Sequence, residues 1–227
     1  MLLTTPVLLA LRAAAPLRCG LVAVGTPRLG GPVRALATER PVSVLVPIAD
    51  DSEEIETACI TDTLVRAGAS VVVASVMPEG RLQCTMSRGL KVVADVAIDE
   101  VATTSFDAIA LPGGMPGAER LRDCETLVAM LKEHAAAGRT TAAVCASPAV
   151  VFATHGLLKQ SATCYPADVF KDKVGAGWTE AQAVVDGNIV TSQGPGTSLQ
   201  FALKLVEILF DRTKAEEIAK QMLTTTA

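Results

Sequence analysis

The chain has 227 residues, half of them hydrophobic, which is enough to build one sizeable core. Aromatic residues make up only 3% and the formal net charge is −4, which argues against a nucleic-acid-binding surface. The six cysteines form no CxxC pair and there are only two histidines, which predicts neither a zinc site nor a disulfide framework.

The first 36 residues differ in composition from the rest of the chain. They contain four arginines, no lysine and no acidic residue. Such a leader is typical of an organellar transit peptide, and no stretch of it is long enough to span a bilayer. Arg34 lies three residues before Ala37, an arrangement that resembles a mitochondrial processing site. We therefore expect a transit peptide over residues 1–36 and a mitochondrial protein. A chloroplast peptide, a secretory signal and an uncleaved cytoplasmic protein are the alternatives.

Apolar runs and helical patterns then alternate. Residues 43–49 and 70–76 are rich in Val and Ile and predict buried strands. Between them, residues 53–67 have helical spacing, with capping residues at 50–52 and an end at Gly68.

The middle of the chain continues this alternation. Residues 84–96 predict two short strands around Ser87-Arg88-Gly89, which together form a protruding hairpin. Residues 106–111 predict another buried strand, which ends in Pro112-Gly113-Gly114. Residues 121–137 predict an amphipathic helix that stops at a glycine.

Cys145 lies where a strand is expected to turn into a helix. Residues 140–144 predict a short buried strand, Ser147 can cap a helix, and Pro148 suits the first helical position. A side chain at this corner stands in the positive field of the helix N-terminus, which stabilises a thiolate. The pattern indicates a nucleophile elbow with sulfur in place of the usual serine oxygen. A buried, inert cysteine is the alternative.

The C-terminal part predicts more strands and a last helix. The predicted strands are at residues 162–165, 181–185 and 189–192, and the last two are joined by the turn Asp186-Gly187-Asn188. Residues 199–210 predict the final helix. Strands that alternate with helices in this way imply a mostly parallel sheet covered on both faces, with ligands over the carboxyl ends of its strands.

A carboxyl group is expected near Cys145. Glu53, Glu54 and Glu56 begin the first helix, and compensation of the helix dipole is a sufficient explanation for the first two. If Glu56 points inward, burial would raise its pKa, and it could donate a hydrogen bond to the sulfur or move a proton.

Backbone N–H groups are expected at the same place. Gly113 and Gly114 follow a buried strand and can approach the elbow closely. Together with the N–H of Ala146 they predict an oxyanion hole, although an ordinary turn would also explain the glycines.

Four motifs, in their order and spacing, resemble the DJ-1 branch of the DJ-1/PfpI family. They are EEIET at 53–57, LPGG at 111–114, AAVCASPA at 142–149 and TSQGPGTS at 191–198. The resemblance covers about residues 42–211. It implies a single DJ-1/PfpI domain over residues 41–227, folded as a flavodoxin-like three-layer α/β/α sandwich with a mostly parallel sheet, and a homodimer.

The resemblance also assigns roles to residues. The family's reactive cysteine, its carboxyl partner, its oxyanion loop and the residue after the nucleophile correspond to Cys145, Glu56, Gly113 with Gly114, and Ala146. Ser87 and Arg88 match the loop whose arginine crosses the dimer interface near the site.

Two positions depart from related branches. Ala146 replaces the histidine of the protease-like branch, so we do not expect a protease. Tyr165 replaces a histidine that animal members carry near the reactive cysteine. His134 and His155 are expected at the surface, so no histidine is assigned as a general base.

The resemblance implies chemistry without a cofactor or metal. One reading is a glyoxalase (lyase) or protein deglycase (hydrolase), which acts on methylglyoxal, glyoxal or glycated proteins and protects against carbonyl and oxidative stress. The other is a redox-sensing protein or chaperone without significant turnover, in which Cys145 is oxidised to a sulfinate. A structural family member without turnover is the third. No membrane association is expected, and nucleic acid is an improbable partner.

Overall fold

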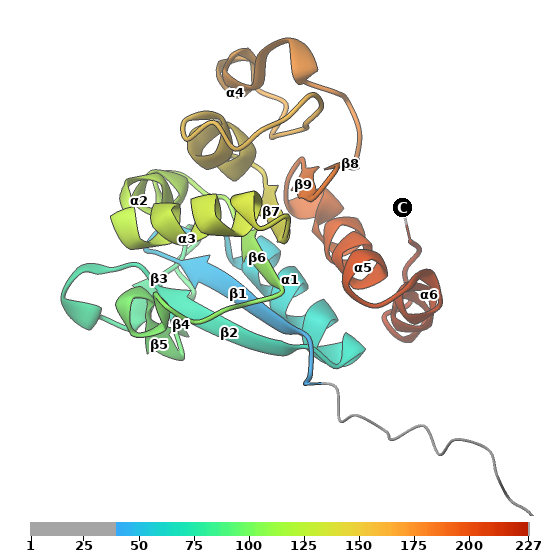
Figure 1. Ribbon diagram of the computed structural model, residues 1–227, viewed down its shortest axis with the longest axis horizontal. Helices are drawn as coiled ribbons and strands as arrows, with labels where there is room; N and C mark the ends of the chain where they lie inside the picture. The colour runs from blue at the N-terminus through green and yellow to red at the C-terminus, as the bar shows by residue number, and fades with distance from the viewer. Residues whose placement is uncertain (1–39, 227) are drawn as a thin grey trace, which may run out of the picture. The chain divides into compact units, whose positions relative to one another are not determined.

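The computed structural model describes residues 40–226, so the predicted transit peptide and processing site lie outside the described residues. A seven-stranded sheet with the strand order β5-β2-β1-β6-β7-β9-β8 forms the centre of the described chain (Figure 1). Its strands are β1 (Ser43–Ile48), β2 (Ser70–Ser75), β5 (Val96–Ala97), β6 (Ala108–Leu111), β7 (Thr140–Val144), β8 (Ala183–Asp186) and β9 (Ile189–Ser192). Every pair of neighbours is parallel except β8 with β9, which confirms the predicted flavodoxin-like α/β fold.

Helices cover both faces of the sheet. They are α1 (Glu54–Ala67), α2 (Gly117–Asp123), α3 (Glu125–Ala136), α4 (Asp168–Val174), α5 (Ser198–Leu209) and α6 (Arg212–Gln221). Helices α1, α5 and α6 contact one another, and α3 packs on β6 and β7. Because β1 and β6 are enclosed between these layers, nearly all of their residues are buried, which explains their continuous apolar sequences. No helix of the described part is long and apolar enough to cross a membrane.

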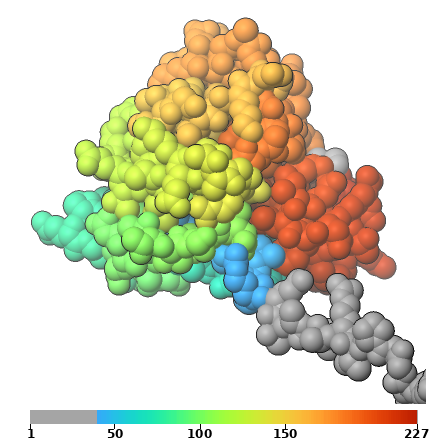
Figure 2. Space-filling model, in the orientation of Figure 1, coloured from blue at the N-terminus to red at the C-terminus, as the bar shows by residue number. Residues whose placement is uncertain are grey.

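Short elements complete the fold. The predicted hairpin is present as β3 (Gln83–Thr85) and β4 (Lys91–Val93), which pair antiparallel. The short helical turns are η1 (Pro78–Gly80), η2 (Ile98–Val101), η3 (Pro148–Ala153), η4 (Gly175–Gly177) and η5 (Pro195–Thr197). The chain from η3 to α4, yellow to orange in Figures 1 and 2, gathers at the end of the sheet where β7 finishes.

Several predicted elements were wrong in part. The helix over 121–137 is two helices, α2 and α3, because the backbone of Cys124 is extended (φ −79°, ψ 102°). The strand over 162–165 is reduced to one bridge between Ala162 and Trp178. The predicted final helix is followed by α6, and α4 was not predicted.

The two histidines are not the surface residues that we expected. His134 is only 3% exposed, and its ring nitrogens lie 2.9 Å from the Phe106 carbonyl oxygen and 3.2 Å from that of Thr140. It therefore ties together the starts of β6 and β7. His155 is half-buried, and its Nε2 lies 2.9 Å from the carbonyl oxygen of Arg122.

Candidate active site

Cys145 follows β7 directly and has a left-handed backbone conformation (φ 65°). For a residue with a side chain this conformation costs roughly 1–3 kcal/mol. Two backbone hydrogen bonds hold it. Its N–H donates to the Ser192 carbonyl at 3.0 Å, and its carbonyl accepts from the Tyr165 N–H at 2.7 Å. The sharp turn places the sulfur over the carboxyl ends of the central strands, as in a nucleophile elbow.

Glu56 lies in the first turn of α1 and points into the protein, where it is fully buried. Its Oε2 accepts a hydrogen bond from the Gly113 N–H at 2.6 Å. Its other oxygen, Oε1, is buried and has no hydrogen-bond partner within the described residues. Burial raises the pKa of Glu56 to about 7, and the negative charge of Glu53 adds to this, whereas the Gly113 N–H and Cys145 act in the opposite direction. Near neutral pH this carboxyl can therefore both hold and release a proton.

The start of α1 differs from the prediction in its capping. Residues 50–52 do not cap the helix. Instead Glu53 is the N-cap, and its side chain accepts a hydrogen bond from the Glu56 N–H at 2.8 Å. Glu53 thereby fixes the turn from which Glu56 points inward.

Replacing Glu56 by glutamine should stabilise the protein in alkaline solution. The pKa rises from 4.5 to about 7 in the folded state, so the wild type loses stability as the pH rises from about 4.5 to about 7. Above pH 7 this loss of stability amounts to roughly 3 kcal/mol. In thermal melts Glu56→Gln should therefore unfold at a higher temperature than the wild type at pH 8, and at nearly the same temperature at pH 4. An equal difference at both pH values would contradict the raised pKa.

Gly113 and Gly114 pass directly beside the cysteine. A Cβ atom on Gly113 would lie 2.6 Å from the Cβ of Cys145, so a side chain does not fit there. Gly114 has a positive φ of 91°, which favours glycine. The backbone N–H groups of Gly114 and Ala146 lower the pKa of the Cys145 thiol, because they favour its charged form. Gly114 and Ala146 thus lie at the sulfur as predicted for an oxyanion hole, whereas the N–H of Gly113 is bound by Glu56 and is not available for it.

The protonation of Cys145 differs from the expectation of a thiolate stabilised by the helix field. Burial is the main cause that raises the pKa of the Cys145 thiol, followed by the negative charge of the nearby Glu56 carboxylate, while the N–H groups of Gly114 and Ala146 lower it. When Glu56 is protonated, its negative charge is gone. Because Oε2 already accepts from Gly113, the proton belongs on Oε1, where it can be donated to sulfur. The thiolate therefore depends on the protonation of Glu56, and the two groups titrate as a pair.

A pocket of about 260 Å³ opens above the sulfur. Arg88 is the only cationic side chain among the described residues that line it, and Tyr165 and Phe170 form an apolar wall. These two rings meet edge to face, with their centroids 6.3 Å apart. Tyr165 is at the expected place, whereas Phe170 was not predicted, because it lies on α4. A pocket of this size suits a small molecule or one modified side chain.

The hairpin that carries Ser87 and Arg88 is anchored at the pocket. The Ser87 hydroxyl and the Arg88 N–H each donate to the Glu54 carboxylate at 2.8 Å. Glu54 therefore does more than compensate the helix dipole. In this single chain Arg88 lines the pocket of its own subunit.

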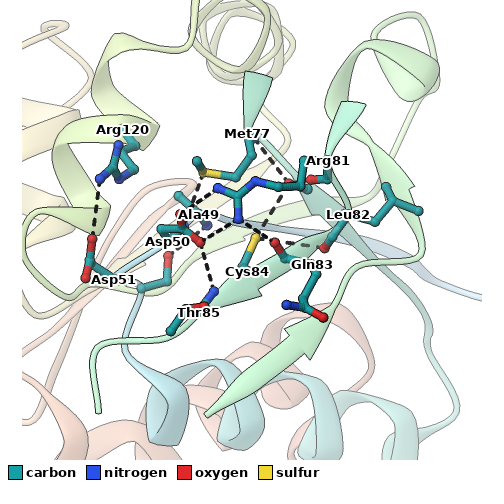
Figure 3. Close-up of polar contacts among 12 residues, drawn as sticks. Ala49, Asp50, Asp51, Met77, Arg81, Leu82, Gln83, Cys84, Thr85 and Arg120 are labelled. Carbon is teal, nitrogen blue, oxygen red and sulfur yellow. Dashed lines mark hydrogen bonds and ion pairs between the residues drawn. The ribbon is translucent and has the colours of Figure 1, made fainter. Parts of the chain in front are cut away.

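A second anchor joins the hairpin to the loop after β1 (Figure 3). The Asp50 carboxylate binds the Arg81 guanidinium at 2.5 Å and accepts from the Thr85 N–H at 2.8 Å. The Arg81 side chain lowers the pKa of Asp50, so this pair stays charged. The N–H of Asp51 donates a hydrogen bond to the Thr85 carbonyl, and the Asp51 carboxylate forms an ion pair with Arg120 at 3.5 Å. These contacts were not predicted, because they join residues that are 31 to 69 positions apart in the sequence.

Comparisons with known proteins show what the chain is similar to. The model of the DJ-1/PfpI family matches residues 42–208. The solved structure of Toxoplasma gondii DJ-1, in an oxidized form, is 52% identical, covers 81% of this chain and 99% of that chain, and has a TM-score of 0.78. A Caenorhabditis elegans relative named glutathione-independent glyoxalase DJR-1.2 is 35% identical over 82% of this chain and 98% of its own length.

Plant relatives are longer than this chain. The protein DJ-1 homolog B of Arabidopsis thaliana is 48% identical over 79% of this chain. The matched region is 41% of that protein's length, and 45% in homolog A. The chain thus spans less than half the length of these two relatives.

Proposed function

The chain belongs to the DJ-1/PfpI family, and we propose that it is a cofactor-independent glyoxalase that converts methylglyoxal or glyoxal to the corresponding hydroxy acid. The observation that carries this proposal is the pairing of Cys145 with Glu56, a buried carboxyl with a pKa of about 7 and one free oxygen. Such a group suits general acid–base catalysis at neutral pH. The glyoxalase name of the Caenorhabditis elegans relative also supports it.

The first step forms a bond between the Cys145 sulfur and the aldehyde carbon of the substrate. The thiol proton passes by way of Glu56 to the former aldehyde oxygen, which gives a hemithioacetal. While negative charge develops on this oxygen, the N–H groups of Gly114 and Ala146 stabilise it.

The second step moves hydrogen between the two carbons. Glu56 takes the proton from the former aldehyde carbon and returns it to the neighbouring carbon. The hydroxyl proton of the first carbon passes to the oxygen of the second, whose carbonyl thereby becomes a hydroxyl. The first carbon is thereby oxidised to a thioester and the second is reduced, so no external oxidant is needed. Water then hydrolyses the thioester, which releases lactate from methylglyoxal and restores the thiol.

The same nucleophile can act on methylglyoxal adducts of protein side chains, which would make the protein a deglycase. The two activities are separated by measuring lactate from free methylglyoxal and from a preformed adduct on a peptide, with a trap for free methylglyoxal in the second assay. Purified protein should form lactate from methylglyoxal. If no lactate forms in either assay, the proposal of an enzyme fails.

The second candidate function is redox sensing, and one observation favours it. Cys145 reaches a pocket, whereas Cys84 and Cys164 are buried. The Toxoplasma gondii relative was solved in an oxidized form. Mild peroxide should convert Cys145 to the sulfinic acid, which a protonated Glu56 stabilises by a hydrogen bond. Peptide mass spectrometry tests this candidate, and earlier oxidation of another cysteine would contradict it.

We also propose a homodimer through α1 and the β3–β4 hairpin. Ile55, Leu90 and Val93 lie on these elements and are 52%, 56% and 66% exposed, so a partner subunit on this face would bury apolar surface. The hydrogen bonds from Ser87 and Arg88 to Glu54 hold the hairpin beside α1. The three apolar side chains can therefore form one surface.

Light scattering at micromolar concentration should give twice the monomer mass. Val93→Lys should shift this protein toward monomer, because it would bury a charge in the interface. Val185→Lys is the control, since Val185 is 46% exposed on β8, away from the hairpin. A monomeric wild type would refute the proposed dimer.

A further inference from the structure

Ser147 has a contact that none of the steps above uses. It was predicted to cap the helix after Cys145, but its side chain makes no capping hydrogen bond, and its own backbone is already helical. The residue is fully buried, and its Oγ donates to the Pro112 carbonyl at 2.5 Å. Ser147 thus connects the elbow to the loop that carries Gly113 and Gly114.

The peptide bond after Pro112 connects this contact to Glu56. Its carbonyl oxygen accepts from the Ser147 hydroxyl, and its N–H, which belongs to Gly113, donates to Glu56 Oε2 at 2.6 Å. A hydrogen bond accepted by an amide carbonyl polarises the amide and makes its N–H a stronger donor. The chain of hydrogen bonds therefore runs from Ser147 through one peptide group to the catalytic carboxyl.

We propose that Ser147 is a positioning residue that holds this peptide group and thereby sets how firmly Glu56 keeps its proton. The catalytic consequence rests on the proposed function, but the effect on Glu56 does not. An N–H donor stabilises the carboxylate form, so a well-held Gly113 N–H favours ionisation. Without the hydroxyl, the peptide group is less polarised and one of its supports is lost. Glu56 should then hold its proton to a higher pH.

Other charged groups around Glu56 are unchanged by this substitution. Cys145 from the elbow and Glu53 from the helix cap act on Glu56, and Arg88 from the hairpin lines the pocket above Cys145. Ser147→Ala removes a neutral hydroxyl and alters none of these charges. A shift in the titration of Glu56 would therefore report on the hydrogen-bond chain.

The test is an infrared titration of the protonated carboxyl of Glu56, assigned by its loss in Glu56→Gln. For Ser147→Ala we expect the midpoint to move upward by about half a pH unit. Ser75→Ala is the matched control, because Ser75 is also fully buried and its Oγ donates to the Arg81 carbonyl at 2.6 Å. Its midpoint should equal that of the wild type. An unchanged midpoint in Ser147→Ala would overturn the inference.

Two further measurements keep the test decisive. If Ser147→Ala does not fold, Ser147→Cys takes its place, because a thiol is a weaker donor of similar size. The titration midpoint of Glu56 should then move upward by a smaller amount. A wild-type midpoint in Ser147→Cys would also overturn the inference. In the turnover assay, the pH dependence assigned to Glu56 should move by the same amount. Because the infrared titration needs no substrate, an inactive wild type would refute the glyoxalase proposal without deciding the role of Ser147.

Discussion

Replacing Cys145 by serine should lower the rate of lactate formation from methylglyoxal by about a thousandfold or more. A serine hydroxyl is a much weaker nucleophile than a thiol, and Glu56 is too weak a base to generate an alkoxide from it. The N–H groups of Gly114 and Ala146 would remain in place, so binding of the substrate should change little. The loss should therefore appear in kcat.

The substitution changes one atom at a half-buried position, so Cys145→Ser should fold like the wild type. Circular dichroism and thermal melts check this. Cys124→Ser is the matched control, because Cys124 is also half-buried but lies between α2 and α3, outside the pocket. Lactate production by Cys145→Ser, or an equal loss in Cys124→Ser, would show that another group is the nucleophile.

The central strands β1, β6, β7 and β9 could be predicted from the sequence because they are buried on both sides. Such strands form continuous apolar runs, and the bounds predicted for β7 agree with the structure. The break at Cys124 could not be predicted, since the apolar spacing continues through it. Helix α4 was missed because it has only seven residues, too few to show a helical period, and none of them is fully buried. Because α4 was not predicted, Phe170 was not predicted as a residue of the pocket either.

The members of the candidate site could be named from motifs, but their interactions could not. Ser147 and Asp50 are polar residues just before helices, a pattern that favours capping. In the structure both instead bind segments about 30 residues away in the sequence, Ser147 at Pro112 and Asp50 at Arg81. Which of Cys145 and Glu56 holds the proton also could not be predicted from the sequence, because this depends on burial and on how close the two groups lie.

Glu56→Gln should separate the two roles of this carboxyl. The glutamine amide can still accept from the Gly113 N–H and donate to sulfur, so alkylation of Cys145 by iodoacetamide should stay within a few-fold of the wild-type rate. It cannot take up and return a proton. Lactate formation should therefore fall by about 10²–10⁴-fold, which is the typical contribution of a general acid–base catalyst.

The pH dependence supplies an internal control for this variant. If the carboxylate takes the proton from the substrate, wild-type kcat should rise with pH through about 7, the value to which burial raises the pKa of Glu56. This rise should be absent in Glu56→Gln. A fall in alkylation as large as the fall in lactate formation would mean that Glu56 acts only on the thiol. Unchanged turnover would mean that another group moves the proton between the two carbons, and the second step of the proposed reaction would then be wrong.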